Sequence, residues 1–279
     1  MTIESSNLLI VGCVKDVENE FCGEFDNLVK ATTKFKNRYY LFVESDSNDK
    51  TCQILSKYKN DINNFEFISL GKIKNNFKFR CQRIAHCRNA YVKEINTNRI
   101  YKNVDYIMVV DLDGINSLLN EKSIHSCFVR NDWHGVFANQ KKAYYDIYAL
   151  RHKYWSPNDC RLELNFFDKY RKSRSFNYWH SVYSKMIEIP ENSEWLEVSS
   201  AFGGAGIYKR ECFVNNLYVG EEENEEVCEH VSFNKTIIKQ GFNLYINPNF
   251  INSAFNEHIK KKFSIRQKLK FALQTLFVK

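Results

Sequence analysis

The sequence predicts an α/β protein built around a largely parallel central sheet. Short apolar runs of strand length alternate with longer charged stretches of helical length through about the first 110 residues. Parallel strands that are buried on both faces appear as continuous apolar runs, and strand–helix alternation is typical of right-handed β-α-β units. A chain of 279 residues that is 44% hydrophobic can bury one substantial core. We therefore expect a single domain with a short appendage.

The first half of the chain shows this alternation most clearly. Strands are expected at residues 8–14, 39–43, 65–70 and 106–110, and helices at residues 16–36, 50–59 and 80–95. Ligands of such sheets bind beyond the carboxyl ends of the strands, where Gly12, Glu44 and Asp111 are expected to lie. The second half is less regular and rich in aromatic residues, and we expect it to complete the same domain.

The formal charge of +7 is concentrated at the carboxyl end of the chain. Residues 259–279 hold seven of the 40 basic residues and no acidic one, so the remainder has 33 of each sign. A nucleic-acid-binding domain would carry basic residues over one face of its fold. A neutral body therefore argues against nucleic acid as a partner.

The cysteines and the apolar runs indicate the compartment. Nine cysteines at irregular spacing form no CxxC pair, which favours free thiols over a disulfide framework or a zinc site. No apolar run approaches the roughly 20 residues needed to cross a bilayer. The first residues lack the basic start of a signal peptide. We expect a cytoplasmic protein.

The strongest chemical signal follows the fourth expected strand, in Val109-Val-Asp-Leu-Asp-Gly114. Alternate residues of an extended chain face the same side, so Asp111 and Asp113 can converge on one cation while Leu112 turns into the core. Mg²⁺ or Mn²⁺ held in this way can bridge the phosphates of a nucleoside diphosphate. The alternative is a strand-ending aspartate followed by an ordinary Asp-Gly turn.

Five segments in this order resemble the GT-A glycosyltransferases, in particular the branch that includes fungal capsule-associated mannosyltransferases and their bacterial and viral relatives. In chain order the segments are Arg83-Ile-Ala-His-Cys-Arg-Asn89, the Asp-Leu-Asp at residues 111–113, Tyr144-Tyr-Asp-Ile-Tyr-Ala-Leu-Arg151, Phe202-Gly-Gly-Ala-Gly-Ile-Tyr208 and Cys228-Glu-His-Val231. The resemblance spans residues 7–252 and implies a GT-A domain over residues 1–256. Gly114 departs from it, because an acidic or bulky residue often follows the second aspartate.

The resemblance implies a reaction and its components. A sugar would pass from a UDP- or GDP-sugar donor to a hydroxyl of a glycan or glycolipid acceptor, with Mn²⁺ or Mg²⁺ as cofactor, in the synthesis of a surface polysaccharide. Asp111 and Asp113 would hold the metal, and His230 would be a third ligand.

On the donor side, the resemblance implies that Gly12 allows close approach of the nucleotide and that Glu44 meets the base or ribose. Arg83 and Arg88 also lie in its motifs. Five residues apart on one helix, they diverge by about 140°, so both cannot point at one phosphate. We assign the diphosphate contact to Arg88, with Asn89 supporting it. A solvated helix face is the alternative for either arginine.

On the acceptor side, the resemblance points to Asp146, Arg151, Gly203, Gly204 and Glu229. If the reaction inverts the anomeric carbon, Glu229 or Asp146 is the expected base. If it retains the configuration, no such base is required. Core aromatics beside a surface ion pair would explain Asp146 and Arg151 equally well, and a lone histidine such as His230 is often structural.

Two other functions use some of the same features. A nucleotidyltransferase, or another metal-dependent phosphoryl-transfer enzyme, also places carboxylates at strand ends. A carbohydrate-binding protein without catalytic activity would need only the aromatic-rich second half. It would need neither the aspartate pair nor a divalent ion.

The carboxyl-terminal segment is expected to be a basic amphipathic helix over residues 257–279. Its apolar residues recur at near-helical spacing among the seven basic ones, and they are Phe263, Leu269, Leu273, Leu276 and Phe277. Such a helix can lie in the interface of an anionic membrane, which predicts peripheral contact with the inner face of the membrane. The alternative is a helix packed on the domain with a solvated basic face.

Overall fold

The computed structural model describes residues 2–254 together with 266, 269 and 273. An eight-stranded sheet forms its centre. In spatial order its strands are β3 (Phe65–Ser69), β2 (Asn37–Glu44), β1 (Asn7–Val14), β4 (Tyr106–Val110), β7 (Ala205–Lys209), β5 (Gly135–Gln140), β10 (Leu244–Ser253) and β6 (Leu196–Glu197). Six strands run in one direction, while β7 and β6 run against their neighbours. The predicted α/β class with a largely parallel sheet is confirmed.

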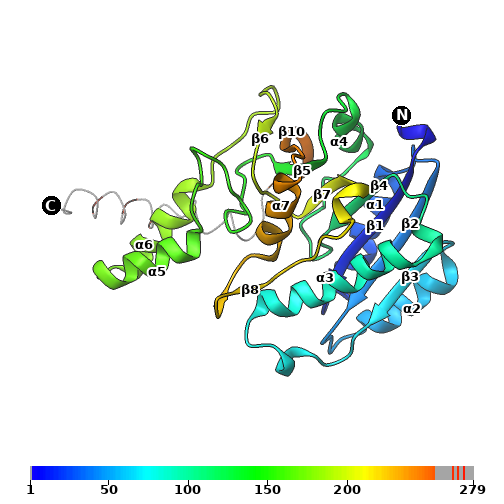
Figure 1. The fold of residues 1–279 in the computed structure, drawn as a ribbon, viewed down its shortest axis with the longest axis horizontal. Coiled ribbons are helices and arrows are strands. Elements are labelled where there is room, and N and C mark those ends of the chain that lie inside the picture. Colours follow the sequence, from blue (N-terminus) through cyan, green and yellow to red (C-terminus); the bar gives the residue numbers. More distant parts are fainter. Residues whose placement is uncertain (1, 255–265, 267–268, 270–272, 274–279) are drawn as a thin grey trace.

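Helices cover both faces of this sheet (Figure 1). One face packs against α3 (Arg80–Thr97) and α7 (Glu229–Lys239), whose Tyr91 and Phe233 lie in the same core as Val109 of β4. The other face packs against α1 (Phe21–Ala31), α2 (Thr51–Asp61) and the short α4 (Glu121–His125). Alternate residues of each strand enter the two cores, as the period of an extended chain requires.

The strands and helices expected in the first half are all present. The first helix is shorter at both ends than the predicted 16–36, and before it the chain turns at Asp16, which has a φ of 51°. The Asp16 carboxylate accepts a hydrogen bond from the Asn48 backbone N–H at 2.7 Å, and this ties the turn to the loop after β2. The third strand ends at Ser69, one residue before the predicted bound.

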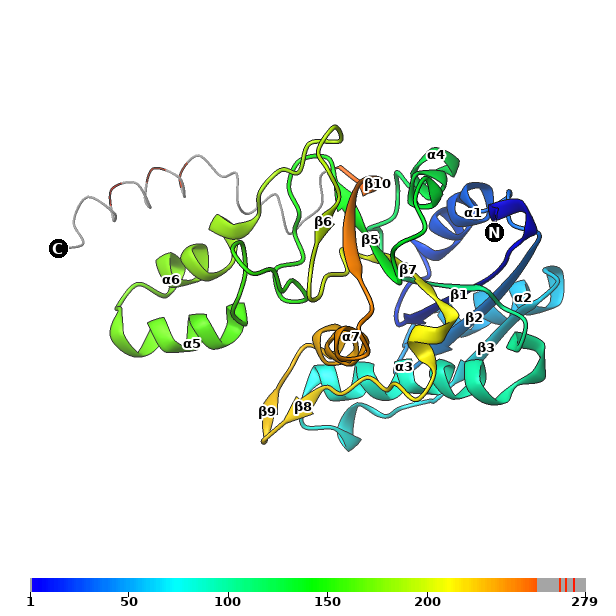
Figure 2. The same ribbon diagram turned by 45° about the horizontal axis from the view of Figure 1, so that its top comes forward.

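The second half also contains two hairpins that lie outside the central sheet. The first is helical and consists of α5 (Cys160–Tyr170) and α6 (Arg174–Ser181), which project away from the sheet in both views (Figures 1 and 2). The second joins β8 (Glu221–Glu222) to β9 (Glu225–Glu226) and lies near the start of α3 (Figure 2). Among the described residues, no helix is long and apolar enough to cross a membrane. The predicted helix over residues 257–279 lies outside the residues that the structure describes.

Candidate active site

The two aspartates lie at the carboxyl end of β4, as predicted. Leu112 between them is buried with 2% of its surface exposed, which confirms that it turns into the core. The Asp111 side chain is 31% exposed and Asp113 is exposed. Gly114 has a φ of 96°, a conformation that residues with a side chain rarely adopt, so it permits the turn after the pair.

Glu24 of α1 holds this turn from below. Its carboxylate accepts hydrogen bonds from the backbone N–H groups of Gly114, at 2.9 Å, and Asn116. Burial raises the pKa of Glu24 to about 7, although the two hydrogen bonds lower it, and the negative charge of Asp113 adds to the rise. The carboxylate thus replaces solvent as the partner of two loop N–H groups.

Three buried amide side chains link the aspartate loop to the second half of the chain. The Asn116 amide donates to the carbonyl of Asp111, at 2.6 Å, and to that of Gly204, at 3.0 Å. Asn252 of β10 donates to Asn116 and to the carbonyl of Gly203. Gln140, at the end of β5, donates to the same carbonyl and to Asn252. We call Asn116, Gln140 and Asn252 the amide network.

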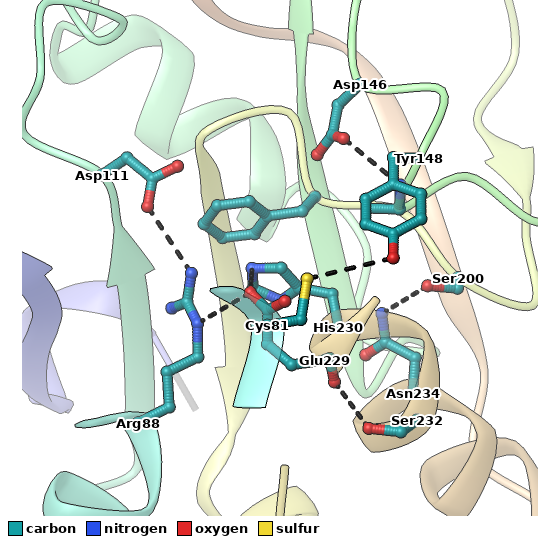
Figure 3. Close-up of polar contacts among 12 residues, drawn as sticks. Cys81, Arg88, Asp111, Asp146, Tyr148, Ser200, Glu229, His230, Ser232 and Asn234 are labelled. Atoms are coloured by element: carbon teal, nitrogen blue, oxygen red, sulfur yellow. Dashed lines mark hydrogen bonds and ion pairs between the residues drawn. The ribbon is translucent and has the colours of Figure 1, made fainter. Parts of the chain in front are cut away.

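Arg88 lies beneath Asp111 and is almost completely buried, with 3% of its surface exposed. Its guanidinium lies 3.6 Å from Asp111 and donates to Glu229 at 3.3 Å (Figure 3). The rings of Phe202 and Tyr218 flank it at 5.3 and 5.6 Å. The site therefore contains a fixed positive charge between two carboxylates, one from β4 and one from the start of α7.

The electrostatics of Asp111 fit a divalent cation. Burial and, next, the charge of Asp113 together raise the pKa of Asp111 to about 8, even though the charge of Arg88 opposes the rise. A carboxyl whose charged form is disfavoured by a neighbouring carboxylate is stabilised by a cation that both can bind. Among the described residues, however, no three His, Cys, Asp or Glu side chains form a group that could hold a metal. Asp111, Asp113 and His230 are therefore not a preassembled three-ligand site.

His230 lies beside Glu229 at the start of α7 and is buried. Its ring stacks on Phe202 with centroids 3.8 Å apart, and its Nε2 lies 3.8 Å from Glu229. Burial lowers the pKa of His230 well below its usual value, and Arg88 lowers it further, so the ring is neutral. Neither ring nitrogen has a hydrogen-bond partner among the described residues. Both nitrogens are buried, and the neutral imidazole is the form that can bind a metal.

The predicted acceptor residues surround the loop at residues 202–204. Asp146 accepts hydrogen bonds from the backbone N–H groups of Gly203 and Ala149, at 3.1 and 3.2 Å. Gly203 and Gly204 have φ values of 69° and 86°, and a Cβ on Gly204 would lie 2.7 Å from Ile115. Arg151 pairs with Asp159 and donates to two backbone carbonyls, so its side chain holds the local chain. The glycines pack against the aspartate loop and so position it.

Two of the predicted donor-side residues, Gly12 and Glu44, make close contacts within the chain. A Cβ on Gly12 would lie 2.5 Å from the carbonyl oxygen of Val110, so the close approach at Gly12 is made by the neighbouring strand β4. Glu44 accepts hydrogen bonds from the Ser47 N–H and the Ser69 hydroxyl. Burial raises the pKa of Glu44, but these bonds outweigh that effect and lower it overall, so the carboxylate is ionised at the end of β2.

Arg83 and Arg88 contact different carboxylates, as their angular separation predicts. Arg83 lies 3.7 Å from Asp46 in the loop after β2, whereas Arg88 contacts Asp111 and Glu229. Asn89 exchanges two hydrogen bonds with the backbone of Tyr218, both at 2.9 Å. Asn89 therefore fixes the Tyr218 segment against α3, and Tyr218 in turn flanks Arg88.

Sequence reasoning missed Glu24 and the amide network. A signal for Glu24 exists, because Phe21, Phe25 and Leu28 form the apolar face of α1 and Glu24 falls on that face by helical spacing. A carboxylate on an apolar face needs a buried partner. The amide network joins residues more than 100 positions apart in the chain, and no local pattern indicates it.

No protein-family model matches the chain, and no curated protein matches it. Solved structures with a similar chain path include a mannosyltransferase from Pyrobaculum calidifontis in complex with GDP-Man and Mn²⁺, at 10% identity and a TM-score of 0.49. They also include S. aureus TarS, at 13% identity and a TM-score of 0.47. A third is glucosyl-3-phosphoglycerate synthase from Mycobacterium tuberculosis in complex with Mn²⁺, UDP and phosphoglyceric acid, at 9% identity and a TM-score of 0.45.

The matches cover 88%, 98% and 98% of this chain and 56%, 66% and 80% of those three chains, respectively. The chain thus spans less than two thirds of the length of the first two. Identities this low leave the chemistry of this chain to be argued from its own residues.

Proposed function

We propose that this chain is a metal-dependent glycosyltransferase of the GT-A type. The observation that carries the proposal is the cluster at the carboxyl end of β4, where Asp111 and Asp113 stand above the buried Arg88 and Glu229. Glu44 ends the parallel strand β2 at the same edge of the sheet. Ligands of such sheets bind at this edge, so the acidic groups lie where a nucleotide would bind.

The donor would be a UDP- or GDP-sugar held by this edge. Asp111 and Asp113 would bind Mn²⁺ or Mg²⁺, with His230 as a further ligand through its neutral ring. The metal would neutralise the phosphates of the donor and so favour departure of the nucleoside diphosphate. Glu44 would accept hydrogen bonds from the ribose or base. Arg88 holds Asp111 and Glu229 in place, and its positive charge also favours a diphosphate nearby.

The acceptor would be a glycan or glycolipid whose hydroxyl meets the sugar between α7 and the loop at residues 202–204. If the reaction inverts the anomeric carbon, Glu229 or Asp146 would remove the hydroxyl proton. If it retains the configuration, neither is needed as a base. Asp146, Arg151, Gly203 and Gly204 position this side of the site through their contacts with one another and with the chain.

We place the reaction in surface polysaccharide synthesis on the cytoplasmic side of a membrane. The basic residues of 259–279 support peripheral contact with an anionic surface. An acceptor carried on a lipid would make that contact useful, because enzyme and acceptor would share one surface.

The experiment is a thermal-shift panel of UDP- and GDP-sugars with Mn²⁺, followed by an assay for the released nucleotide. A bound donor at 100 times its Kd should stabilise the protein by about 2.7 kcal/mol.

Asp111→Ala and Asp113→Ala should each abolish transfer with little loss of folding, because removing one carboxylate relieves repulsion in the metal-free protein. Full activity in either variant, or turnover by the wild type in excess chelator, would rule out a metal-dependent mechanism.

The same panel separates the two rival functions. Release of pyrophosphate from a nucleoside triphosphate would identify a nucleotidyltransferase. Sugar binding that is indifferent to chelation, with no nucleotide released, would identify a carbohydrate-binding protein. A glycosyltransferase releases a nucleoside diphosphate or monophosphate.

A further inference from the structure

Helix α5 carries apolar side chains on two opposite faces. Its inner face buries Cys160 and Leu164. Its outer face exposes Leu162, Phe166 and Tyr170, with 51%, 56% and 74% of their surfaces in contact with solvent. Residues four apart on a helix are neighbours, and the rings of Phe166 and Tyr170 lie 5.0 Å apart, so the three form one stripe. We call Leu162, Phe166 and Tyr170 the apolar stripe.

A stripe of this kind needs a partner. The outer face of a helix in a soluble fold is ordinarily polar, and a contiguous exposed apolar patch marks an interaction site. The α5–α6 hairpin projects from the sheet, so its outer face is well placed to meet a large partner (Figure 2).

Cations lie beside Tyr170 at the carboxyl end of the apolar stripe, whereas Glu225 lines the same hollow as Leu162 and Phe166. Residues 160–181 contain five basic and two acidic residues. Both acids have partners within the fold: Glu163 pairs with Lys185, and Asp168 lies 3.7 Å from Arg174. Arg161 likewise pairs with Glu226 of β9. The end of α5 and the turn after it expose Lys169, Arg171 and Lys172 on either side of Tyr170. The patch thus combines aromatic side chains with an excess of positive charge.

The positive charge of this patch indicates which partner binds to it. Residues 259–279 carry seven basic residues and no acid, so that segment would be repelled from the hairpin. A second copy that presents the same face would also meet like charge. An anionic phospholipid surface complements both parts of the patch, because aromatic rings favour the membrane interface and cations favour the headgroups.

We propose that the α5–α6 hairpin docks on an anionic membrane, with Phe166 and Tyr170 in the interface and Lys169, Arg171 and Lys172 at the headgroups. The inference is independent of residues 259–279 and of the proposed sugar transfer. If that transfer holds, docking would bring the site toward a lipid-linked acceptor, because Arg151 pairs with Asp159, the residue that caps the start of α5.

The first test places a reporter in the stripe of the full chain. Phe166→Trp should gain a component of emission that brominated lipids quench in vesicles containing phosphatidylserine. Vesicles of phosphatidylcholine alone should quench it little. Ile100→Trp is the matched control, because Ile100 is 58% exposed and follows the far end of α3. If the emission gained in the Phe166→Trp variant is quenched no more than that of the control, the proposal is overturned, even if the protein binds vesicles elsewhere.

The second test measures partition onto phosphatidylserine vesicles. Tyr170→Ser combined with Lys172→Glu should weaken partition about tenfold relative to Ile100→Ser combined with Arg99→Glu, which removes a similar exposed pair elsewhere. Equal partition of the two double variants would count against docking. So would concentration-dependent dimers of the wild type that the Tyr170→Ser, Lys172→Glu variant abolishes, because the stripe would then be a contact between copies.

Discussion

Arg88 illustrates how one buried side chain can organise a site at the residue scale. Its guanidinium contacts Asp111 and Glu229 and lies between two aromatic rings. Removing one member of a buried ion pair leaves the other charge without compensation, which costs more than the loss of a surface pair. Arg83 offers a comparison on the same helix, because it pairs with Asp46 and contacts neither carboxylate at the end of β4.

We predict that Arg88→Ala weakens binding of UDP or GDP with Mn²⁺ more than Arg83→Ala does. The loss should be tenfold or more for a charged contact near a phosphate, on the order of 1.5–3 kcal/mol. Isothermal titration of each variant measures it, and Arg88→Lys tests whether charge alone suffices. Equal or reversed losses would show that the wrong arginine was chosen.

The pKa values of Asp111 and Glu24 predict how stability depends on pH. Both carboxyls have a folded-state pKa above their ordinary values, near 8 and 7, so the folded protein holds these protons more tightly than the unfolded chain does. Their contribution to stability is complete below about pH 4 and is lost as the pH rises through those folded values. The melting temperature of the metal-free protein should therefore fall between about pH 4 and about pH 8, and this contribution should level off above that range.

Asp111→Asn removes one of these groups and should flatten the fall. Saturating Mn²⁺ should flatten it in the wild type, because the ion favours the charged carboxylates. Differential scanning calorimetry across this range measures both effects. An identical pH profile for wild type and Asp111→Asn would contradict the assigned cause.

At the scale of elements, the loop after β4 owes its shape to α1. Glu24 accepts two loop N–H groups, and a glutamine there can accept only through its single carbonyl oxygen. Leaving one buried donor without a partner costs about 1–3 kcal/mol. We predict that Glu24→Gln weakens Mn²⁺ binding about tenfold at pH 8, while Glu24→Asp retains part of the affinity.

Glu20→Gln is the matched control for this change. Glu20 lies one helical turn earlier, beside Gly114, and its replacement removes the same charge without removing either hydrogen bond. If Glu20→Gln weakens Mn²⁺ binding as much as Glu24→Gln, the effect is electrostatic. The positioning role of Glu24 would then be wrong.

The elements that sequence predicted well are those with local signals. The apolar runs at residues 8–14 and 106–110 are buried parallel strands, and their neighbours in the sheet follow from strand–helix alternation. The aspartate pair was located because its spacing matches the period of an extended chain. Gly12 shows the limit, because its absent side chain admits the Val110 carbonyl of another strand. Only the packed sheet shows which group approaches a glycine.

The contacts of residues that have more than one plausible partner were harder to predict from the sequence. Asn89 neighbours Arg88 in the sequence, and it exchanges hydrogen bonds with the backbone of Tyr218, 129 positions along the chain. The contacts of Asp146 and Arg151 depend on how the chain near residue 200 folds back against them. Such contacts follow from tertiary packing, for which the sequence contains no periodic signal.

On the scale of the whole molecule, positive charge is unevenly distributed along the chain. The formal excess of positive charge belongs to residues 259–279 and leaves the remainder balanced. We predict that deleting residues 259–279 reduces sedimentation with anionic vesicles while hydrolysis of the donor in solution is preserved. Each basic residue near the surface contributes about 1 kcal/mol. Undiminished sedimentation, or a truncated chain that fails to fold, would contradict the prediction.

The amide network has a consequence for how the site meets its ligands. The buried side chains of Asn116, Gln140 and Asn252 join the loop after β4 to strands β5 and β10 through hydrogen bonds of 2.6–3.0 Å. The loop is then ordered before any donor arrives, so no part of the binding free energy goes into ordering it. The backbone N–H of Asp111 donates to the Gly204 carbonyl. Its hydrogen should exchange with deuterium only when the sheet itself opens. The heat-capacity change on donor binding should therefore be no larger than the value expected from the surface area that the ligand buries.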